Sequence, residues 1–427
     1  MKRLFALMLL ASATLPAYAT IEVTIDPGQV SAQPIAIVPM KGANSVQVDM
    51  SRVIESDLYR TGEFRPLSRD SMREQPSDST LVHFDQWRAV NADSLVVGNL
   101  RENERGQVIA RFWLLDPVRQ QQLLGFDMPA ANAADMRRVA HQIADLVYEK
   151  LTGKPGFFNT QIAYIAAAGY GYQRRWQLMV ADADGENARA IATSREPLMS
   201  PAWSPDRKRL AYVGYERGRM SIYVQSVDTG QVRKLVSEKG INGSPAWSPD
   251  GKLLAVTLSF ENNPDIYVMD PENGGSRRRL TDHYGIDTEA SWAPDGQSLV
   301  FTSDRGGSPQ IYRVSVNGGE PERLTFEGKQ NLKASYSPDG KQLVLVNMQD
   351  GRYRIALFDL ATKDLRLITD GSLDESPQFS PNGAVVIYAT TSGGRAEVAT
   401  VSVDGRVHSR VRQAVDIREP AWSPLNR

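Results

Sequence analysis

A short phrase that returns six times constrains the fold of this 427-residue chain more than any other feature. Each copy places an aromatic residue just before a turn of the Ser-Pro-Asp-Gly type, and the aromatic residue recurs every 43 to 45 positions. Equal units of this length, each with sequence for four short strands, are typical of β-propeller blades. We therefore expect the aromatic side chains to pack between neighbouring blades. They are Trp203, Trp247, Trp292, Tyr336, Phe379 and Trp422.

The two ends of the repeat predict how the ring closes. The first unit has three strand-like stretches, beginning with Ile162–Ile165, but no aromatic phrase precedes it. An unpaired phrase, Glu419–Pro424, follows the last complete unit. We predict that this phrase is the innermost strand of the first blade, so that six four-stranded blades close without a free sheet edge.

The first residues predict export. Two basic residues, an apolar run over residues 4–15 and Ala-Tyr-Ala at positions 17–19 form the pattern of a signal peptide over residues 1–19. The run is too short for a membrane anchor. The chain has no cysteine, which excludes a disulfide, a thiolate metal ligand or lipid attachment at this site. The formal net charge of −1 gives no general attraction to nucleic acid or to an anionic membrane.

The repeat is absent from residues 20–155, where the pattern is that of a mixed α/β domain. Gly and Pro residues at 153–156 predict the boundary, and the propeller is expected over 156–427. The hydrophobic periodicity predicts strands at 21–25, 34–38, 94–98, 108–113 and 122–126 and helices at 46–59 and 132–151.

A search for catalytic motifs gives no positive result. The Gly-x-Ser-x-Gly nucleophile motif is absent, and the four histidines have no zinc-binding spacing. The acidic stretch Asp182–Asn187 fits a hairpin turn better than a calcium loop, because other repeats carry similar turns at this point. We therefore predict no catalytic residue, metal ligand or cofactor. The alternative is a secreted propeller hydrolase that uses loop carboxylates and a metal.

The loops between repeats indicate where function lies. If the strands of a blade are named A to D from the channel outward, the A–B and C–D turns lie on one face of the disc. The B–C and D–A loops lie on the other face, and they vary in sequence while the turns do not. Variable loops on a rigid scaffold commonly carry function. We expect the D–A residues to surround the channel mouth, with Glu289, Glu375 and Glu419 making it acidic. The alternative is that they are only solvated loop ends.

Four features together resemble the TolB family, the propeller proteins of the Tol–Pal system of Gram-negative bacteria. They are the signal peptide, the mixed α/β domain, the junction Leu151–Phe158 leading into Ile162–Tyr164, and the six aromatic repeats. The resemblance covers the whole chain, although Arg207 stands where the family usually has Gly. It implies a monomeric, non-enzymatic periplasmic protein that acts in outer-membrane integrity and in constriction during cell division.

The resemblance also implies two partners, neither of them a nucleic acid, and no direct insertion into the membrane. The lipoprotein Pal would bind at the channel mouth, which corresponds here to Asn242, Gly243, Ser244, Asp287, Thr288, Glu289, Asn331, Lys333, Asp374, Glu375 and Glu419. The inner-membrane protein TolA would bind the mature N-terminal segment, which corresponds here to Thr20, Ile21, Glu22, Val23, Thr24, Ile25 and Asp26. The composition of this segment fits either a free strand or one folded back on its own protein.

Overall fold

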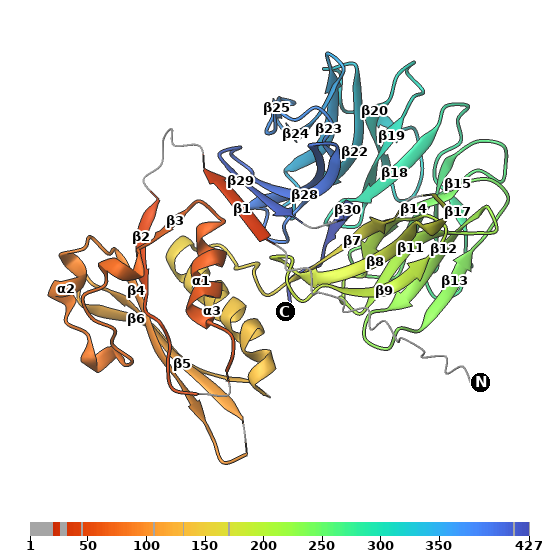
Figure 1. Ribbon diagram of the computed structural model, residues 1–427. Helices are drawn as coiled ribbons and strands as arrows, with labels where there is room; N and C mark the ends of the chain where they lie inside the picture. Colours follow the sequence, from red (N-terminus) through yellow and green to blue (C-terminus); the bar gives the residue numbers. More distant parts are fainter. Residues whose placement is uncertain are drawn as a thin grey trace, which may run out of the picture.

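An α/β domain is followed by a six-bladed β-propeller in the computed structural model of the chain, which confirms the predicted fold class (Figure 1). The structure describes residues 20–25, 32–43, 46–105, 107–130, 132–169, 171–412 and 415–426. The predicted signal peptide and Asp26 lie outside these residues. None of the described helices is long and apolar enough to cross a membrane.

The α/β domain is built on a five-stranded sheet with the strand order β3-β2-β4-β5-β6. The predicted meander is present, since β4, β5 and β6 pair as successive antiparallel neighbours. The elements are β2 (Gln33–Ile37), α1 (Met50–Tyr59), β3 (Phe64–Pro66), η1 (Arg69–Ser71), η2 (Ser79–Leu81), α2 (Phe84–Arg88), β4 (Ser94–Glu102), β5 (Val108–Asp116), β6 (Gln121–Ala130), η3 (Ala133–Asp135) and α3 (Met136–Thr152).

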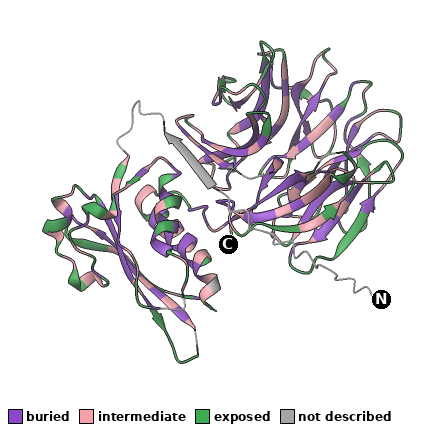
Figure 2. Ribbon diagram, in the orientation of Figure 1, coloured by how far each residue is buried: buried purple, intermediate pink, exposed green. Residues whose placement is uncertain are grey.

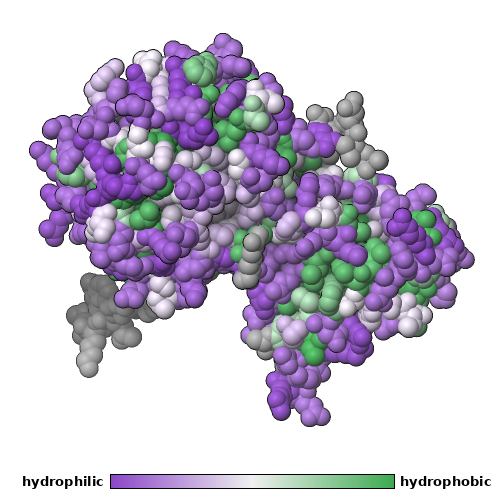
Figure 3. All heavy atoms as spheres, turned by 180° about the vertical axis from the view of Figure 1, so that it is seen from behind, coloured by the Kyte–Doolittle hydropathy of each residue, from purple (hydrophilic) through white to green (hydrophobic). Residues whose placement is uncertain are grey.

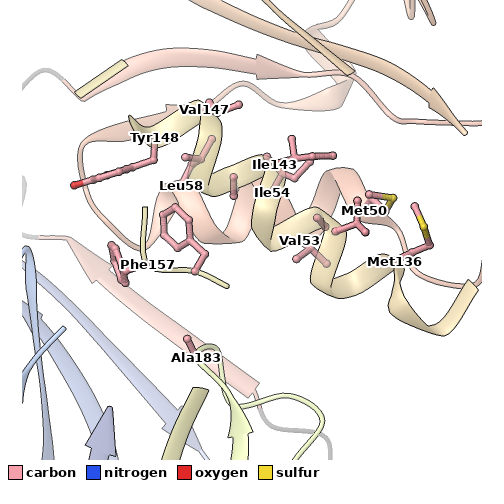
Figure 4. Close-up of a cluster of buried hydrophobic side chains, with 14 of the residues drawn as sticks. Met50, Val53, Ile54, Leu58, Met136, Ile143, Val147, Tyr148, Phe157 and Ala183 are labelled. Carbon is pink, nitrogen blue, oxygen red and sulfur yellow. The ribbon is translucent and has the colours of Figure 1, made fainter. Parts of the chain in front are cut away.

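The two long helices of this domain form its core together with one face of the sheet. Helix α1 begins where the Asp49 side chain accepts a hydrogen bond from the Arg52 backbone N–H. Helix α3 ends at Gly153, which adopts φ = 74°. Between these ends the apolar side chains of the two helices interdigitate, with Ile54 and Ile143 near the centre (Figure 4). Seen from behind, hydrophobic residues gather on this domain, whereas the propeller is mostly hydrophilic outside (Figure 3).

Each propeller blade is an antiparallel sheet whose innermost strand lines the central channel. From the channel outward, blade one is β30 (Asp416–Trp422), β7 (Gln161–Ala168), β8 (Arg175–Asp182) and β9 (Arg189–Ser194), and η4 (Gly171–Gln173) precedes β8. Blade two is β10 (Leu198–Trp203), β11 (Arg209–Glu216), β12 (Arg219–Ser226) and β13 (Val232–Val236), and blade three is β14 (Asn242–Trp247), β15 (Leu254–Leu258), β16 (Asp265–Met269) and β17 (Arg278–Arg279).

The last three blades follow the same plan, with buried strands inside and exposed loops outside (Figure 2). Blade four is β18 (Asp287–Trp292), β19 (Ser298–Ser303), β20 (Gln310–Ser315) and β21 (Glu322–Arg323). Blade five is β22 (Gln330–Tyr336), β23 (Gln342–Gln349), β24 (Arg352–Asp359) and β25 (Leu365–Leu367). Blade six is β26 (Glu375–Phe379), β27 (Val385–Ser392), β28 (Arg395–Ser402) and β29 (Val407–Arg412).

The repeated aromatic residues join each blade to its neighbour, as predicted. Five of the six are buried, and Tyr336 is partly buried. Three tryptophans donate the indole N–H to a carbonyl oxygen on the inner strand of the preceding blade: Trp203 to Ala421 at 3.2 Å, Trp247 to Ala202 at 3.2 Å and Trp292 to Ala246 at 3.0 Å. The first of these bonds links blade two to β30. Together with the pairing of β30 with β7, it confirms that the C-terminal strand closes the ring.

The Ser-Pro-Asp-Gly phrases form tight turns on one face of the disc, which we call the turn face. In blade three, the Gly251 backbone N–H donates to the Ser248 carbonyl at 2.9 Å, and the Ser248 hydroxyl donates to the Asp250 carboxylate at 2.7 Å. The last turn residue has positive φ, which suits glycine. Arg207 holds the same conformation, with φ = 62°.

Strand β1 (Thr20–Ile25) lies on the propeller, although it precedes the α/β domain in the sequence. It pairs antiparallel with β29, from Thr20 opposite Arg412 to Ile25 opposite Val407, and so adds a fifth strand to the outer edge of blade six (Figure 1). The N-terminal segment is therefore folded back on its own protein in this structure.

The junction between the domains is packed and apolar. Phe157 and Phe158 contact the ring of Tyr148 on α3, and Phe157 also contacts Trp422 of the closing strand. Gly156 comes so close to Asp145 that a Cβ atom would lie 2.3 Å from its Cα. The junction therefore ties helix α3 to blade one.

Candidate partner-binding face

Every inner strand carries a β-bulge at the same place, and a residue with positive φ occupies each bulge. These six residues line the mouth of the channel, and we call them the mouth ring. They are Ser200, Ser244, Glu289, Lys333, Ser376 and Glu419. None is glycine, so each holds a backbone conformation that L-residues seldom adopt. The sequence predicts Ser244, Glu289, Lys333 and Ser376 in the D–A loops, whereas the structure places them in the inner strands.

The mouth ring holds charges of both signs. Glu419 accepts a hydrogen bond from the Ser200 backbone N–H at 2.7 Å, and the Lys333 ammonium lies 3.9 Å from the same carboxylate. The Lys333 Nζ also donates to the Ser376 hydroxyl at 2.8 Å. Glu289 accepts from the Thr302 hydroxyl across the bulge. The mouth is therefore mixed in charge, and the expectation of a simply acidic mouth needs this correction.

The cavity behind the mouth ring has a volume of about 420 Å³. Alanine, serine and proline residues of the inner strands and turns line its walls, together with the repeated aromatic residues. The opening thus combines a polar, partly charged entrance with an apolar interior. Such a combination suits binding of a protein or peptide side chain as well as of a small molecule.

Five of the eleven predicted mouth residues are buried, and the four of them with polar side chains face inward, which corrects their predicted role as direct contacts. The Asn242 side chain bonds its own loop at the Glu238 backbone, and Asp287 accepts from the Arg305 guanidinium at 2.6 Å. These residues fasten the D–A loops rather than offering a surface. The Asn331 side chain forms hydrogen bonds with Gln310, Glu327 and Asn347. The Asp374 carboxylate accepts hydrogen bonds from the Thr369 and Thr390 hydroxyls. Burial raises the pKa of Asp374.

The other predicted residues lie at the mouth. Thr288 is partly exposed, and its hydroxyl accepts a hydrogen bond from Thr257 at 3.2 Å, which links neighbouring blades. Glu375 is partly exposed, and its carboxylate lies 3.9 Å from the Arg418 guanidinium. Gly243 is buried and contributes only backbone. The structure therefore brings the partly exposed residues together around one opening.

Sequence reasoning missed a set of exposed hydrophobic side chains on the same D–A loops, which we call the apolar rim. Tyr284 is 84% exposed and Phe326 is 71% exposed. The full set is Ile241, Tyr284, Ile286, Phe326 and Leu373. Ile241, Ile286 and Leu373 each directly precede the buried Asn or Asp that fastens the loop. An apolar residue followed by Asn or Asp was therefore a signal available in the sequence. Exposed apolar side chains gathered on one face mark an interaction surface.

No arrangement of acids suited to metal catalysis lies at the mouth in the part of the chain that the structure describes. Among the described residues, one group of three side chains has the types and spacing of possible metal ligands. It consists of Asp57, His141 and Asp184 and lies between the domains, away from the mouth. The mouth carboxylates lie instead beside hydroxyl, amide, ammonium or guanidinium groups. This geometry gives the metal-dependent hydrolase reading no support.

Comparison with known proteins extends over both domains. A family model described as the TolB amino-terminal domain matches residues 21–123, and one described as the TolB beta propeller domain matches residues 148–426. The chain is 47% identical to the Tol-Pal system protein TolB of Thioalkalivibrio sulfidiphilus over 98% of this chain and 97% of the relative. It is 46% identical to that of Methylococcus capsulatus over 95% of each. The crystal structure of TolB from Acinetobacter baumannii superposes with a TM-score of 0.87, at 38% identity, over 96% of this chain and 100% of that one.

Proposed function

This chain belongs to the TolB family of Tol-Pal system proteins, and we propose that it acts there as a non-enzymatic periplasmic adaptor between Pal and TolA. In this proposal Pal binds what we call the loop face of the propeller, which carries the D–A loops and lies opposite the turn face. TolA binds the mature N-terminal segment. The adaptor thereby supports outer-membrane integrity and constriction during cell division.

The observation that carries the Pal site is the coincidence of the apolar rim and the mouth ring on one face. Protein interfaces obtain most of their affinity from a few large side chains, with aromatic residues prominent, surrounded by polar contacts. Tyr284 and Phe326 supply exposed aromatic area. Glu289, Lys333 and Glu419 supply charges that fix the orientation of a partner. The buried Asn242, Asp287, Asn331 and Asp374 hold the loops in place for it.

The proposed TolA site is strand β1. An extended segment binds well by adding to the open edge of a partner sheet, because its main-chain groups form the ladder of hydrogen bonds. These groups are already engaged on one side by β29. A partner that takes the same edge of β1 must release the strand from blade six first. Residue Asp26, which completes the predicted segment, would follow β1 into the complex.

Release of β1 offers a way for the two partners to influence each other. If Pal binding favours either the paired or the released state of β1, then TolA must change the affinity for Pal by the same factor. Couplings of this kind are typically about 1–3 kcal/mol, or roughly 5- to 150-fold in affinity. Equal Pal affinities for the mature protein and for a version without residues 20–29 would exclude this coupling.

The Pal site is tested by measuring the affinity of purified Pal for a Tyr284→Ser, Phe326→Ser double variant. We expect about a tenfold or greater loss, because truncation of an interface aromatic commonly costs more than about 1 kcal/mol. Val232→Ser is the matched control, since Val232 is an exposed hydrophobic residue on the outer strand of blade two. Equal losses in the two proteins, or none in either, would contradict the proposed face.

A further inference from the structure

A buried group of charged side chains joins the α/β domain to blade one. His141 on α3 lies between two carboxylates that come from different parts of the chain. Its Nδ1 lies 2.6 Å from the Asp57 carboxylate on α1, and its Nε2 lies 3.6 Å from the carboxylate of Asp184, in the turn after β8. All three residues are less than 5% exposed. Figure 4 shows α1 and α3 next to the turn that carries Ala183.

Two arginines complete this group, which we call the interdomain cluster. Arg60 lies 3.1 Å from the Asp57 carboxylate and donates to the Ala183 carbonyl at 2.9 Å, so one side chain of α1 holds the propeller turn directly. Arg137 on α3 pairs with Asp184, and its Nε lies 3.8 Å from the Asp182 carboxylate. The contacts across this boundary are therefore ionic, beside the apolar junction at Phe157.

The geometry around the imidazole favours a proton on both ring nitrogens. Nδ1 donates to Asp57, so in a neutral ring Nε2 would carry a lone pair. That lone pair would face the Asp184 carboxylate, and no hydrogen-bond partner for Nε2 is present in the described part of the chain. A buried lone pair opposite a carboxylate is unfavourable, whereas an N–H at the same place is attracted to it. The doubly protonated ring fits this site better.

Charge balance leads to the same state and disfavours a metal ion. Three carboxylates (Asp57, Asp182 and Asp184) face two guanidinium groups, so a proton on His141 brings the formal charge of the cluster to zero. A divalent cation among the same carboxylates would have to sit next to both arginines. The interdomain cluster therefore binds a proton better than a metal.

The pKa shifts of His141 and Asp184 agree with this, whereas burial raises the pKa of Asp182 and works against its charge. Burial lowers the pKa of His141, but the carboxylates of Asp57 and Asp184 outweigh it, and the net shift is upward. Burial alone would raise the pKa of Asp184, but His141 and the two arginines bring it below its usual value. The charged groups around His141 are Asp57 and Arg60 on α1, Arg137 and Asp145 on α3, and Asp182 and Asp184 at the propeller turn.

We propose that the protonated His141 side chain clamps the α/β domain onto blade one, and that loss of this proton loosens the docking of the two domains. A pH-dependent contact thus sets how firmly the domains hold together. Because the raised pKa belongs to the folded state, the stabilisation is complete below the ordinary histidine value of 6.5 and is lost as pH rises through the raised value.

Asp145 supplies a control for the pH dependence, because it lies beside the interdomain cluster and its pKa is also raised, but by burial. Burial raises its pKa to about 7. Its carboxylate accepts hydrogen bonds from the Phe158 and Asn159 backbone N–H groups of the junction, at 2.7 and 3.2 Å. It too makes stability fall as pH rises towards 7. Asp145→Asn removes this contribution and leaves His141, Asp57 and Asp184 unchanged, while its amide oxygen can accept only one of the two backbone hydrogen bonds.

Docking of the domains is measured directly by a distance between them. The chain has no cysteine, so Val118→Cys and Val232→Cys, both at exposed positions, allow one spin label on each domain. Val232→Cys with Phe326→Cys gives a control distance within the propeller. We expect one narrow interdomain distance at pH 5.5, loss of that single peak at a pH above the raised pKa of His141, and no change in the control pair. Asp145→Asn should behave like the parent protein.

His141→Asn keeps a donor near the Nδ1 position but cannot carry the charge, so its interdomain distance should be broad at both pH values. An interdomain distance that is independent of pH, or one that still responds to pH in His141→Asn, would overturn the clamp. If His141→Asn does not fold, NMR titration of the His141 ring in the unaltered protein decides. A ring whose pKa is 6.5 or lower overturns the proposal, and so does a Zn²⁺-dependent rise in melting temperature that Asp57→Asn abolishes.

Discussion

The two ends of the propeller channel solve the same backbone problem with different residues. At the turn face, positive φ falls on glycine in four of the five complete turns, namely at Gly251, Gly296, Gly340 and Gly383, with Arg207 as the exception. At the mouth, the six bulge residues with positive φ are serine, glutamate and lysine. A non-glycine residue in such a conformation costs of order 1–3 kcal/mol. The turn face is thus built for stability, whereas the mouth keeps side chains at a cost in stability, as expected of a binding site.

The hydrogen bonds at the two ends differ in the same way. Four of the five complete turns use one serine hydroxyl and one acidic or amide side chain in the same arrangement, as in Ser337 with Asp339 and Ser380 with Asn382. The fifth turn has Ala293 in place of the serine. The mouth residues bond in a different way in almost every blade. Uniform chemistry therefore accompanies a structural role, and varied chemistry accompanies the proposed recognition of a partner.

Opening the ring of blades should destabilise both ends of the channel, and we expect it to lower stability more than any other change. Deletion of residues 419–427 removes most of β30 and with it the buried Trp422, whose indole donates to Thr160 at 2.8 Å. Loss of one large buried aromatic side chain alone costs about 3–5 kcal/mol, which is a large share of the stability of a domain. Thermal unfolding should therefore begin at a much lower temperature. A truncated protein that melts like the full chain would contradict ring closure by β30.

A glycine substitution at the turn face should affect stability and not binding. In Gly251→Ala the new Cβ has room, because its nearest neighbour would be Pro205 at 3.7 Å, but φ is 71°. The strain of this backbone conformation should cost about 1–2 kcal/mol, measured by denaturant unfolding. Affinity for Pal should be unchanged in the folded protein. Weaker Pal binding with unchanged stability would reverse the roles assigned to the two faces.

A glycine substitution at one non-glycine position of each end should separate stability from binding. Arg207→Gly relieves positive φ at the turn face and removes a guanidinium nitrogen, Nη1, that is buried without a hydrogen-bond partner. Ser244→Gly relieves the same strain in the mouth ring. Both should gain about 1 kcal/mol in unfolding free energy. Only Ser244→Gly should weaken Pal binding, and equal affinities of the two variants would remove the distinction between the ends.

The smallest expected effect is a difference in titration between the two ends. Hydrogen bonds from serine hydroxyls lower the pKa of Asp250 and of Asp339 at the turn face, while burial raises that of Asp374 at the loop face. The turn-face aspartates therefore stabilise the fold when the pH is above their ordinary pKa of 3.8, and this stabilisation is lost as the pH falls through their lowered pKa. The contribution of Asp374 is present at low pH and is lost as pH rises through its raised value. NMR titration of the carboxyl carbons measures all three, and a common pKa would contradict the difference.

Regular features were predictable from the sequence, and long-range contacts were not. The repeat period and the unpaired Glu419–Pro424 phrase led to six closed blades, because each unit specifies its own strands. The short elements α2 and β3 were missed, since five and three residues hold too little periodicity. At the mouth, Asn242 and Asp287 looked like exposed loop residues because both types are common in loops. Their burial depends on partners such as Arg305, in the loop that follows β19.

The interdomain cluster could not be anticipated for a similar reason. His141 meets Asp57 across 84 positions of sequence. Nothing local to either residue indicates this contact, and an isolated histidine on a helix is most simply read as a surface or packing residue. The backbone pairing of β1 was half predictable: its strand character was evident in the alternation of residues 21–25, but not its position on β29.

Hydrogen–deuterium exchange of the mature protein with and without saturating Pal tests whether Pal binds at the channel mouth, because it examines both ends of the channel in one experiment. We expect slower exchange in the D–A loops and the first residues of the inner strands, over 238–244, 281–289, 325–333 and 370–376. We expect unchanged exchange in the turns at 204–208, 248–252 and 293–297. Protection confined to those turns, or spread equally over both faces, would contradict the assignment of partner binding to the channel mouth.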